Sequence, residues 1–465
     1  MSTLLTNGRV YIDGAFTPAD LLLKGGSAFV FDKGDSPDIT SVVDLSGKDI
    51  LPGFADVHVH FREPGFSYKE TIRTGSKAAA HGGYTCVCPM PNIDPVPCDY
   101  EHLKTELDII ERDAVCDVIP YGAITMKQDG RSELADMESM APFVCAFSDD
   151  GRGVQTGGLM RDAMQLARSL GKMIVAHCED ESLLEPGGCI HDGPFALTCG
   201  LTGISSASEW RQVERDVKLC DETGCAYHVC HVSTKESVAV IRDAKQSGVN
   251  VTCETAPHYL ALTQDDVAEY CRAGEPADSG RFKMNPPLRE KADRDALREA
   301  VFDGTIDIIA TDHAPHSAEE KSRGLEKSPF GIVGLETAFP VLYTRLVKEG
   351  LLTYERLIEC LSSAPRDRFG LPGAGMLDHG SFRSLISETA GGGCEGDVGY
   401  KEAVQGDRMI FPDLTVIDPD NEYTIDPDTF ASMGRATPFQ GDRVTGKVVM
   451  TVHNGEIIYQ ADCKR

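Results

Sequence analysis

The sequence has little aromatic and little basic character. Aromatic residues make up 7% of its 465 residues, with a single tryptophan, and 45 lysines and arginines stand against 73 aspartates and glutamates, for a formal net charge of −28. Such an acidic excess argues against nucleic acid and against anionic membrane surfaces as partners. It does not fix the charge of a substrate, because a small basic pocket can lie within an acidic surface.

Three sequence signals are also missing. No apolar run reaches the roughly 18 residues of a membrane span, so none is expected. The first residues, MSTLLTNGRVYIDG, lack the basic segment and apolar stretch of a secretory signal. The 16 cysteines are scattered, without the two CxxC pairs of a structural zinc site. Together these absences predict reduced thiols and a cytoplasmic protein.

The composition that remains, 41% hydrophobic and 25% charged, is typical of a globular chain with a sizeable core. Short strand-like segments with glycine-rich turns occupy both ends of the chain. We predict that residues 1–50 and 412–465 form one small β-sandwich module, with a type I′ hairpin at Asn454-Gly455. A long insertion, with a glycine-rich stretch, is predicted over 376–411.

Strand-like apolar runs alternate with helical stretches over 51–375. After a first strand within 51–65, further strands are predicted over 84–91, 115–124, 141–151, 173–180, 225–234, 249–258 and 305–316. Helices are predicted over 68–83, 101–113, 159–172, 207–224, 235–248 and 293–304. Eight strands in alternation with helices predict an α/β fold, a (β/α)8 TIM-type barrel. An open doubly wound sheet is disfavoured, because no glycine-rich dinucleotide motif opens the pattern.

The segment LPGFADVHVHFREPG, residues 51–65, carries the first chemical signal. His58 and His60 are two apart, so in an extended strand both imidazoles point to the same face. Imidazole is a preferred ligand of zinc. Arg62 falls on the same side, where its planar cation suits a carboxylate. A bare HxH pair is more often only a strand with two histidines, so the interpretation depends on other ligands.

Those ligands occur at the ends of later predicted strands. Asp150 follows strand four, His177 strand five, His231 strand six and Asp312 strand eight. Taken singly, His177 could be a core histidine, Asp150 part of a turn and Asp312 a helix cap. In a parallel barrel, however, these strand ends converge on the face that carries active sites.

The set suits two close metal ions, with His58, His60 and Asp312 on one and His177 and His231 on the other. Asp150 would bridge the ions together with a water or hydroxide. Asp312 would act as general base and acid on that zinc-bound hydroxide.

Several motifs resemble those of the dihydroorotase family of the amidohydrolase superfamily, in its longer bacterial form, type I. They are GFADVHVHFREPG, MPN (90–92), FSDDGRG (147–153), AHCED (176–180), CHVSTK (230–235), KMNPPLR (283–289), ATDHAPH (310–316) and SPFGIVGLETAFP (328–340). The resemblance covers about residues 45 to 375. In this form an aspartate bridges the metals where many superfamily members use a modified lysine, and Asp150 rather than Asp149 matches that position.

The resemblance implies reversible cyclisation of N-carbamoyl-L-aspartate to L-dihydroorotate in pyrimidine biosynthesis, with one or two Zn²⁺ ions per subunit. It implies a substrate α-carboxylate held by Arg62, Asn92 and His316, and a ureido edge read by Asn285 and the backbone of Phe330 and Gly331. His60 and Phe61 are also implied as substrate contacts. His258 and His313 are expected to orient ligands, and His228 to be a packing residue.

Two other functions remain open. A related cyclic amidohydrolase would act on dihydropyrimidines, hydantoins or allantoin, but those relatives usually carry the bridging lysine. An inactive scaffold for a carbamoyltransferase would be expected to have lost metal ligands, and all six are present here. The resemblance further implies a homo-oligomer, a dimer, and association with aspartate carbamoyltransferase.

Overall fold

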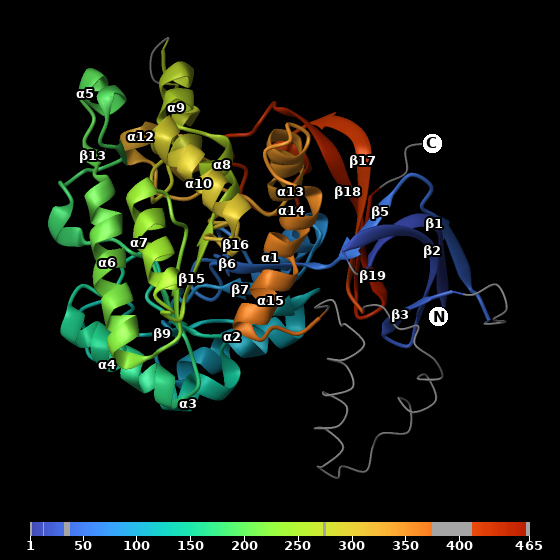
Figure 1. The fold of residues 1–465 in the computed structure, drawn as a ribbon, viewed down its shortest axis with the longest axis horizontal. Helices are drawn as coiled ribbons and strands as arrows, with labels where there is room; N and C mark the ends of the chain where they lie inside the picture. Colours follow the sequence, from blue (N-terminus) through green and yellow to red (C-terminus); the bar gives the residue numbers. More distant parts are fainter. Residues whose placement is uncertain (1, 13, 32–37, 273–275, 374–411, 462–465) are drawn as a thin grey trace.

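The structure, a computed structural model, describes residues 2–12, 14–31, 38–272, 276–373 and 412–461. Short strands lie inside a layer of helices, and a separate set of longer strands lies to one side (Figure 1). The predicted insertion over 376–411 falls outside the described residues. None of the described helices combines the length and the apolar character needed to cross a bilayer.

The inner strands are parallel and form two groups. One group has the order β6 (Phe54–Val59), β7 (Tyr84–Pro89), β8 (Asp117–Val118). The other has the order β9 (Gly122–Ala123), β10 (Phe147–Ser148), β11 (Ile174–Ala176), β14 (Tyr227–Val229), β15 (Val251–Thr255), β16 (Ile308–Ile309). Residues 117–123 join the groups, because β8 pairs with β7 and β9 pairs with β10. At the other end Val59 pairs in parallel with His313, just past β16.

Each of the six predicted helices is present within a few residues of its expected bounds. They are α1 (Ile72–His81), α2 (Tyr100–Asp113), α4 (Gly157–Ser169), α6 (Ser206–Thr223), α7 (Lys235–Gln246) and α10 (Lys291–Asp303). Several begin at capping side chains that accept an early backbone N–H, namely Thr71, Asp99, Thr156 and Thr234. These caps and the apolar stripe of each helix explain why the sequence indicated them.

Shorter helices were not predicted, because four to eight residues hold too little periodicity. They are α3 (Met137–Met140), α5 (Pro194–Cys199), α8 (Pro257–Ala261), α9 (Gln264–Tyr270), α11 (Ala318–Lys321), α12 (Gly324–Lys327), α13 (Ala338–Leu342), α14 (Tyr354–Leu361) and α15 (Ser363–Phe369). The strand predicted over 141–151 was too long: residues 141–143 form a 3₁₀ turn, and the strand is limited to β10. A small pair, β12 (Ile190–His191) and β13 (Gly203–Ile204), lies apart.

The two ends of the chain share one sheet. Its order is β19 (Glu456–Gln460), β18 (Arg443–His453), β17 (Leu414–Thr424), β5 (Asp49–Pro52), β1 (Thr3–Ile12), β2 (Ala15–Lys24), β3 (Ser27–Val30), with β4 (Ser41–Asp44) on β1. β5 and β17 join the halves by antiparallel pairing. The predicted hairpin is confirmed between β18 and β19, where Asn454 and Gly455 have φ of 48° and 68°, as a type I′ turn requires.

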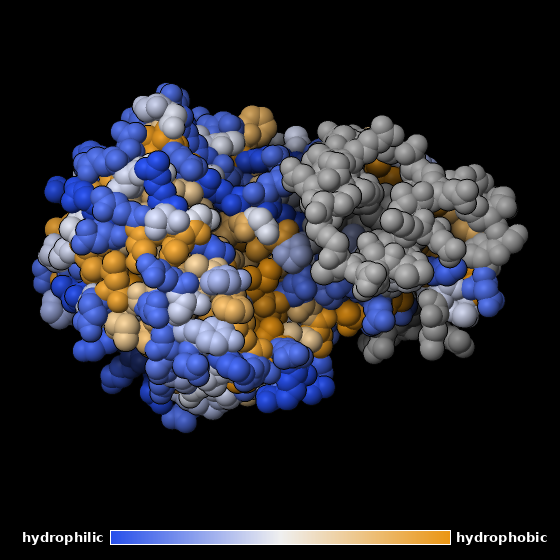
Figure 2. Space-filling view, turned by 90° about the horizontal axis from the view of Figure 1, so that it is seen from below, coloured by the Kyte–Doolittle hydropathy of each residue, from blue (hydrophilic) through white to orange (hydrophobic). Residues whose placement is uncertain are grey.

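The face of the molecule in Figure 2 carries both polar and apolar side chains. Polar side chains line its upper, left and lower edges, and apolar side chains gather toward its middle. Among the described residues the buried apolar side chains form one large core between the inner strands and helices, a smaller one within the terminal sheet, and a third that includes Val57, Cys88 and Val175 of the inner strands.

One carboxylate is buried in the helical layer without compensation. Glu106 on α2 is 1% exposed, and among the described residues neither of its oxygens has a hydrogen-bond partner. Burial raises the pKa of Glu106 well above its ordinary value of 4.5. The folded state therefore holds this proton more tightly than the unfolded state, and stability falls as the pH rises through the interval between the two pKa values.

Glu106→Met is expected to increase the free energy of unfolding at pH 8 by about 1–3 kcal/mol, because it removes the unpaired buried carboxylate. The gain should be smaller near pH 4.5, where the group is protonated in the folded state and already half protonated in the unfolded state, so that most of the penalty is gone. Urea unfolding at the two pH values measures this difference. Glu111→Met, at an exposed position of the same helix, is the matched control and should change little. An equal gain at both pH values would contradict the assigned cause.

Candidate active site

The predicted metal ligands gather around Asp150 at one end of the parallel strands. Asp150 Oδ1 lies 3.4 Å from His58 Nε2 and 3.6 Å from His231 Nε2. The same oxygen is 3.7 Å from His177 Nδ1, and Asp150 Oδ2 is 3.5 Å from His60 Nε2. One carboxylate thus faces four imidazoles, the arrangement expected of a bridging ligand.

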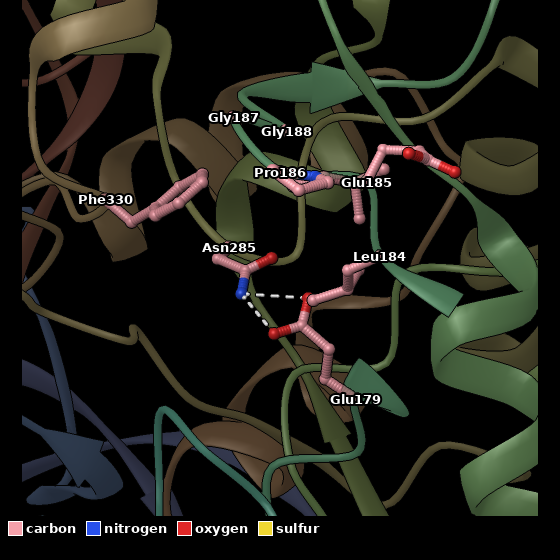
Figure 3. Close-up of a pocket in the computed structure, with 9 residues that line it drawn as sticks. Glu179, Leu184, Glu185, Pro186, Gly187, Gly188, Asn285 and Phe330 are labelled. Atoms are coloured by element: carbon pink, nitrogen blue, oxygen red, sulfur yellow. Dashed lines mark hydrogen bonds between the residues drawn. The ribbon is translucent and has the colours of Figure 1, made fainter. Parts of the chain in front are cut away.

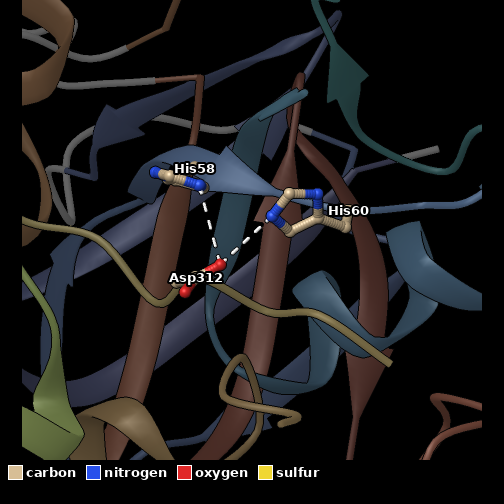
Figure 4. Close-up of side chains that lie close together, drawn as sticks. All are labelled: His58, His60 and Asp312. Carbon is tan, nitrogen blue, oxygen red and sulfur yellow. Dashed lines mark hydrogen bonds and ion pairs between the residues drawn. The ribbon is translucent and has the colours of Figure 1, made fainter. Parts of the chain in front are cut away.

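Asp312 completes the cluster from the segment after β16. Its Oδ1 lies 3.1 Å from His60 Nε2 and 3.6 Å from His58 Nε2 (Figure 4). His60 is also bound to the segment after β16 through its backbone, because its N–H donates to the carbonyl of His313 at 2.8 Å. The six side chains, although drawn from five strand ends, are all buried.

This spacing fits a metal centre. Ligands roughly 2.0–2.1 Å from a tetrahedral zinc ion stand about 3.3 Å apart. The histidine nitrogens lie 3.1 to 3.7 Å from the two aspartates, and His177 Nδ1 lies 2.9 Å from His231 Nε2. His58 Nε2 and Asp150 Oδ1 are buried at the centre, yet neither forms a hydrogen bond among the described residues. Buried polar atoms seldom stay unpaired, and a cation between them would satisfy both.

Three of the histidines are fixed through the nitrogen that points away from the centre. The pairs are His58 Nδ1 with Glu254 (2.6 Å), His60 Nδ1 with Asn92 Oδ1 (2.8 Å) and His177 Nε2 with Glu179 (3.4 Å). When such an imidazole is neutral and its outer nitrogen donates to an oxygen, its inner nitrogen keeps the lone pair that a metal ion needs. Such partners set the tautomer and the ring orientation of a metal ligand.

Backbone strain coincides with the site. Among the described residues six non-glycine residues have positive φ, and three of them are Arg62 (61°), His231 (33°) and Asp312 (48°). Left-handed backbone costs these side chains free energy and persists where the surroundings impose it. Here it turns the side chains that follow β6, β14 and β16 toward one point.

Charge pairing keeps both aspartates ionised. Burial alone would raise the pKa of Asp150, but His58 and His231 outweigh it and hold that pKa well below 3.8. Burial likewise opposes ionisation of Asp312, and its hydrogen bond with His60 together with the nearby charge of His58 lowers its pKa. Two carboxylates in a buried site thus offer negative charge to a cation.

A basic pocket lies beside this cluster, within the acidic protein. Arg62 Nε donates to the carbonyl of Pro315 at 3.4 Å. Lys69 Nζ donates to His316 Nδ1 at 3.2 Å and pairs with Glu320 at 3.1 Å. The His316 Nε2–H donates to the carbonyl of Phe330 at 2.7 Å. Burial, followed by Arg62 and Lys69, lowers the pKa of His316, so this imidazole is neutral. Lys69 was not predicted, because nothing in FSYKET marks it as part of the pocket.

Asn92 and Phe61 meet the pocket differently. The Asn92 Oδ1 is taken by His60, which leaves the amide N–H₂ available as a donor. The Phe61 ring is buried against α1, where a Cβ on Gly75 would lie only 2.4 Å from it. A substrate contact by Phe61 therefore falls to its backbone.

Two of the other predicted contacts, Asn285 and Phe330, line a cavity of about 300 Å³ (Figure 3). Glu179, Asn285 and Phe330 form part of its wall, with residues 184–188 opposite. The Gly331 N–H already donates to the carbonyl of Lys283 at 3.0 Å. The substrate contact predicted at Gly331 thus competes with a bond inside the protein.

Lys321, another residue missed by the sequence reasoning, holds this loop. Its buried ammonium donates to the carbonyls of Lys283 (3.1 Å), Pro329 (2.9 Å) and Gly331 (2.7 Å). Burial, then the charge of Lys283, lowers the pKa of Lys321 to about 7. These three backbone acceptors offset the cost of burying the ammonium group, and they hold the chain on both sides of Phe330.

His228 is not the simple packing residue that was predicted. Its Nε2 lies 3.2 Å from Glu254, the same carboxylate that holds His58. The prediction assumed strict alternation from His228 to His231, but β14 ends at Val229 and His231 has positive φ. Glu254 itself was missed; its only signal was an acid inside the apolar strand VTCET. His313 does contact the cluster through its carbonyl, whereas His258 Nε2 has no hydrogen-bond partner among the described residues.

Glu254→Gln should weaken metal binding by about 10- to 100-fold, because the strong charge-assisted bond to His58 is lost. Competition with a zinc chelator measures the affinity directly. Glu236→Gln, on the outer helix α7, is the control and should leave the affinity unchanged. Undiminished zinc affinity in Glu254→Gln would contradict the role assigned to this carboxylate.

Comparison with known proteins agrees with this geometry. A family model described as Dihydro-orotase-like matches residues 47–237. A protein named dihydroorotase from Bacillus cytotoxicus is 45% identical over 465 residues, covering 99% of both chains, and one from Bacillus cereus is 46% identical over 464 residues with the same coverage. The chain belongs to the dihydroorotase family. The resemblance drawn from its motifs is thereby confirmed.

Solved structures add the wider fold of this dihydroorotase-family chain. L-hydantoinase (dihydropyrimidinase) from Arthrobacter aurescens superposes with a TM-score of 0.80 at 24% identity, covering 98% of this chain and 96% of that one. A dihydropyrimidinase from Brevibacillus agri gives a TM-score of 0.76 at 21% identity. At such identities the likeness establishes the mixed α/β fold shared with these enzymes.

Proposed function

We propose that this chain is a dihydroorotase, which interconverts N-carbamoyl-L-aspartate and L-dihydroorotate in pyrimidine biosynthesis. The observation that carries the proposal is the meeting of two features: one aspartate facing four imidazoles, and a basic pocket at Arg62 and Lys69 directly beside it. The first suits attack on an amide carbonyl, and the second suits the carboxylate of an acidic substrate.

We propose zinc as the metal, in one or two ions per subunit, held by His58, His60, Asp150, His177, His231 and Asp312. When bound, zinc would polarise the amide carbonyl and lower the pKa of a water molecule. Asp312 would accept the proton of the attacking water and deliver it to the ring nitrogen as the C–N bond breaks. In the reverse direction the same carboxylate would take a proton from the ureido nitrogen.

The substrate carboxylate would be held by Arg62, by the free amide N–H₂ of Asn92 and at the His316 side of the pocket. Arginine suits this task, because its planar fork can donate two parallel hydrogen bonds. His60 and the backbone of Phe61 would lie next to the same group. Asn285 and the backbone at Phe330 and Gly331 would form hydrogen bonds with the ureido edge of the substrate.

The wider fold family makes hydantoinase or dihydropyrimidinase activity the second candidate. Purified enzyme supplied with zinc should hydrolyse dihydroorotate with a kcat/KM well above that for dihydrouracil, hydantoin or allantoin. A higher value for any of those three substrates would overturn the proposal. No turnover of any of them would instead favour a scaffold without catalysis.

For the architecture, we propose a (β/α)8 barrel over 51–375 and a β-sandwich module from 1–50 and 412–465. The parallel pairing of Val59 with His313 supports closure of the barrel, since it joins the first strand to the segment after the last. The shared terminal sheet supports the module.

We also propose a cytoplasmic homodimer, with aspartate carbamoyltransferase as a further partner. The apolar area in Figure 2 supports self-association, because large exposed apolar patches commonly mark interfaces. Free buried thiols such as Cys86, Cys88 and Cys230 suit a reducing compartment. Sedimentation of the chain, alone and with the carbamoyltransferase, tests both associations.

A further inference from the structure

Glu179 connects the metal cluster to the cavity in Figure 3. One of its oxygens lies 3.4 Å from His177 Nε2, on the side of that ring away from Asp150. Both of its oxygens accept from Asn285 Nδ2, at 3.1 and 3.0 Å. The two contacts come from different segments, the turn after β11 and the loop before α10, so Glu179 ties a predicted metal ligand to a predicted substrate contact.

This carboxylate fixes which way the Asn285 amide faces. An ionised carboxylate only accepts hydrogen bonds, so the Asn285 N–H₂ must turn toward Glu179 and the Oδ1 must turn away. In Figure 3 that oxygen points from Glu179 toward the side of Pro186. Asn285 Oδ1 is shielded from solvent and has no hydrogen-bond partner among the described residues. Asn285, a residue of the cavity wall, therefore carries one buried acceptor that is unsatisfied among the described residues.

We propose that Glu179 is a positioning residue that holds Asn285 as a hydrogen-bond acceptor for a substrate N–H. The inference rests on the proposed function and makes it more specific. Dihydroorotate carries two ring N–H groups, and N-carbamoyl-aspartate carries ureido N–H groups. An acceptor fixed in advance selects such donors and rejects a ring that offers a methyl group or a carbonyl oxygen at that position.

A double-mutant cycle separates this role from a merely structural one. Glu179→Gln lets the Asn285 amide rotate, because a glutamine amide can donate as well as accept. The KM for dihydroorotate is expected to rise by about 10-fold, the usual effect of one lost hydrogen bond, while kcat changes less. Asn285→Ala should raise KM similarly, and Glu179→Gln added to Asn285→Ala should raise it no further.

Dihydroorotate methylated at either ring nitrogen, used as a competitive inhibitor, tests the selected group directly. For at least one of the two compounds, the wild type should bind the methylated ring about 10-fold more weakly than the parent, and Asn285→Ala should lose this discrimination. Glu181→Gln is the matched control, since Glu181 belongs to the same segment but pairs with Arg131 at the surface. Zinc content is measured for every variant, because Glu179 also contacts His177.

The outcomes are distinguishable. The role of Glu179 is overturned if the wild type turns over dihydroorotate but the effects of the two substitutions on KM add independently. It is also overturned if wild type and Asn285→Ala discriminate against both methylated rings to the same extent. A loss in Glu179→Gln that follows its zinc content and is restored by excess zinc also overturns it, in favour of support for His177 alone. Failure of the wild type to turn over dihydroorotate would overturn the proposed function itself.

Discussion

Asp312→Asn should lower kcat for dihydroorotate hydrolysis by roughly 10²- to 10⁴-fold, the usual range for loss of a general base. The amide is nearly the same size and keeps one oxygen near His60 and His58, which lie 3.1 and 3.6 Å from the native Oδ1. It cannot accept the proton of the attacking water. KM should change far less than kcat, because the basic pocket is untouched.

The control for this change is Asp307→Asn. Asp307 precedes β16 at its other end and pairs with Lys245, so its replacement should leave kcat close to that of the wild type. Metal content of Asp312→Asn must be determined alongside, since loss of the ion would mimic loss of the base. A fully metal-loaded Asp312→Asn enzyme with more than about a tenth of wild-type kcat would contradict the proposed role.

Removing the metal should abolish turnover, with a residual rate at least about 10³-fold below that of the loaded enzyme, because polarisation of the carbonyl and activation of water are both lost. Zinc added back to the stripped protein should restore the rate, and the equivalents needed give the number of ions per chain. Stripped protein should also unfold at a lower temperature, since ions that bind only the folded state stabilise it.

Asp150→Ala tests the bridging role of this carboxylate in the same experiment. Its carboxylate lies within 3.7 Å of all four histidines, so its loss should reduce bound zinc and leave the protein inactive even with excess metal. Full turnover by protein shown to be metal-free would refute the metal-dependent proposal. Retention of a complete metal complement by Asp150→Ala would refute the bridging role.

The gathering of the six candidate ligands was predictable because they follow five strands of one parallel set, and parallel strands place their ends on one face. Their identities as histidine and aspartate are visible in the sequence. The contacts of Glu254, Glu179 and Lys321 were not predictable, since each depends on which segments become neighbours and how the chain bends after a strand. The left-handed turn at His231, which broke the expected alternation, is a case where tertiary structure overrides a local rule.

The fold shows the same contrast between features that the sequence predicts and features that depend on packing. Long amphipathic helices such as α6 and α7 carry a repeating pattern over three or more turns, and their bounds were found closely. The elements between β15 and the terminal sheet are mostly short, and several begin at proline or lack a capping side chain. Their positions follow from packing on the inner strands rather than from local preference.

The contact between His60 and Asp312 joins residues 252 positions apart. A growing chain on the ribosome therefore has no intact centre until the segment beyond β16 has emerged and paired with Val59. The complete set of six candidate ligands is consequently one of the last features of the site to form. Products truncated before this segment would keep the partners of His58 and His60 at Glu254, Asn92 and Asp150 but would lack Asp312.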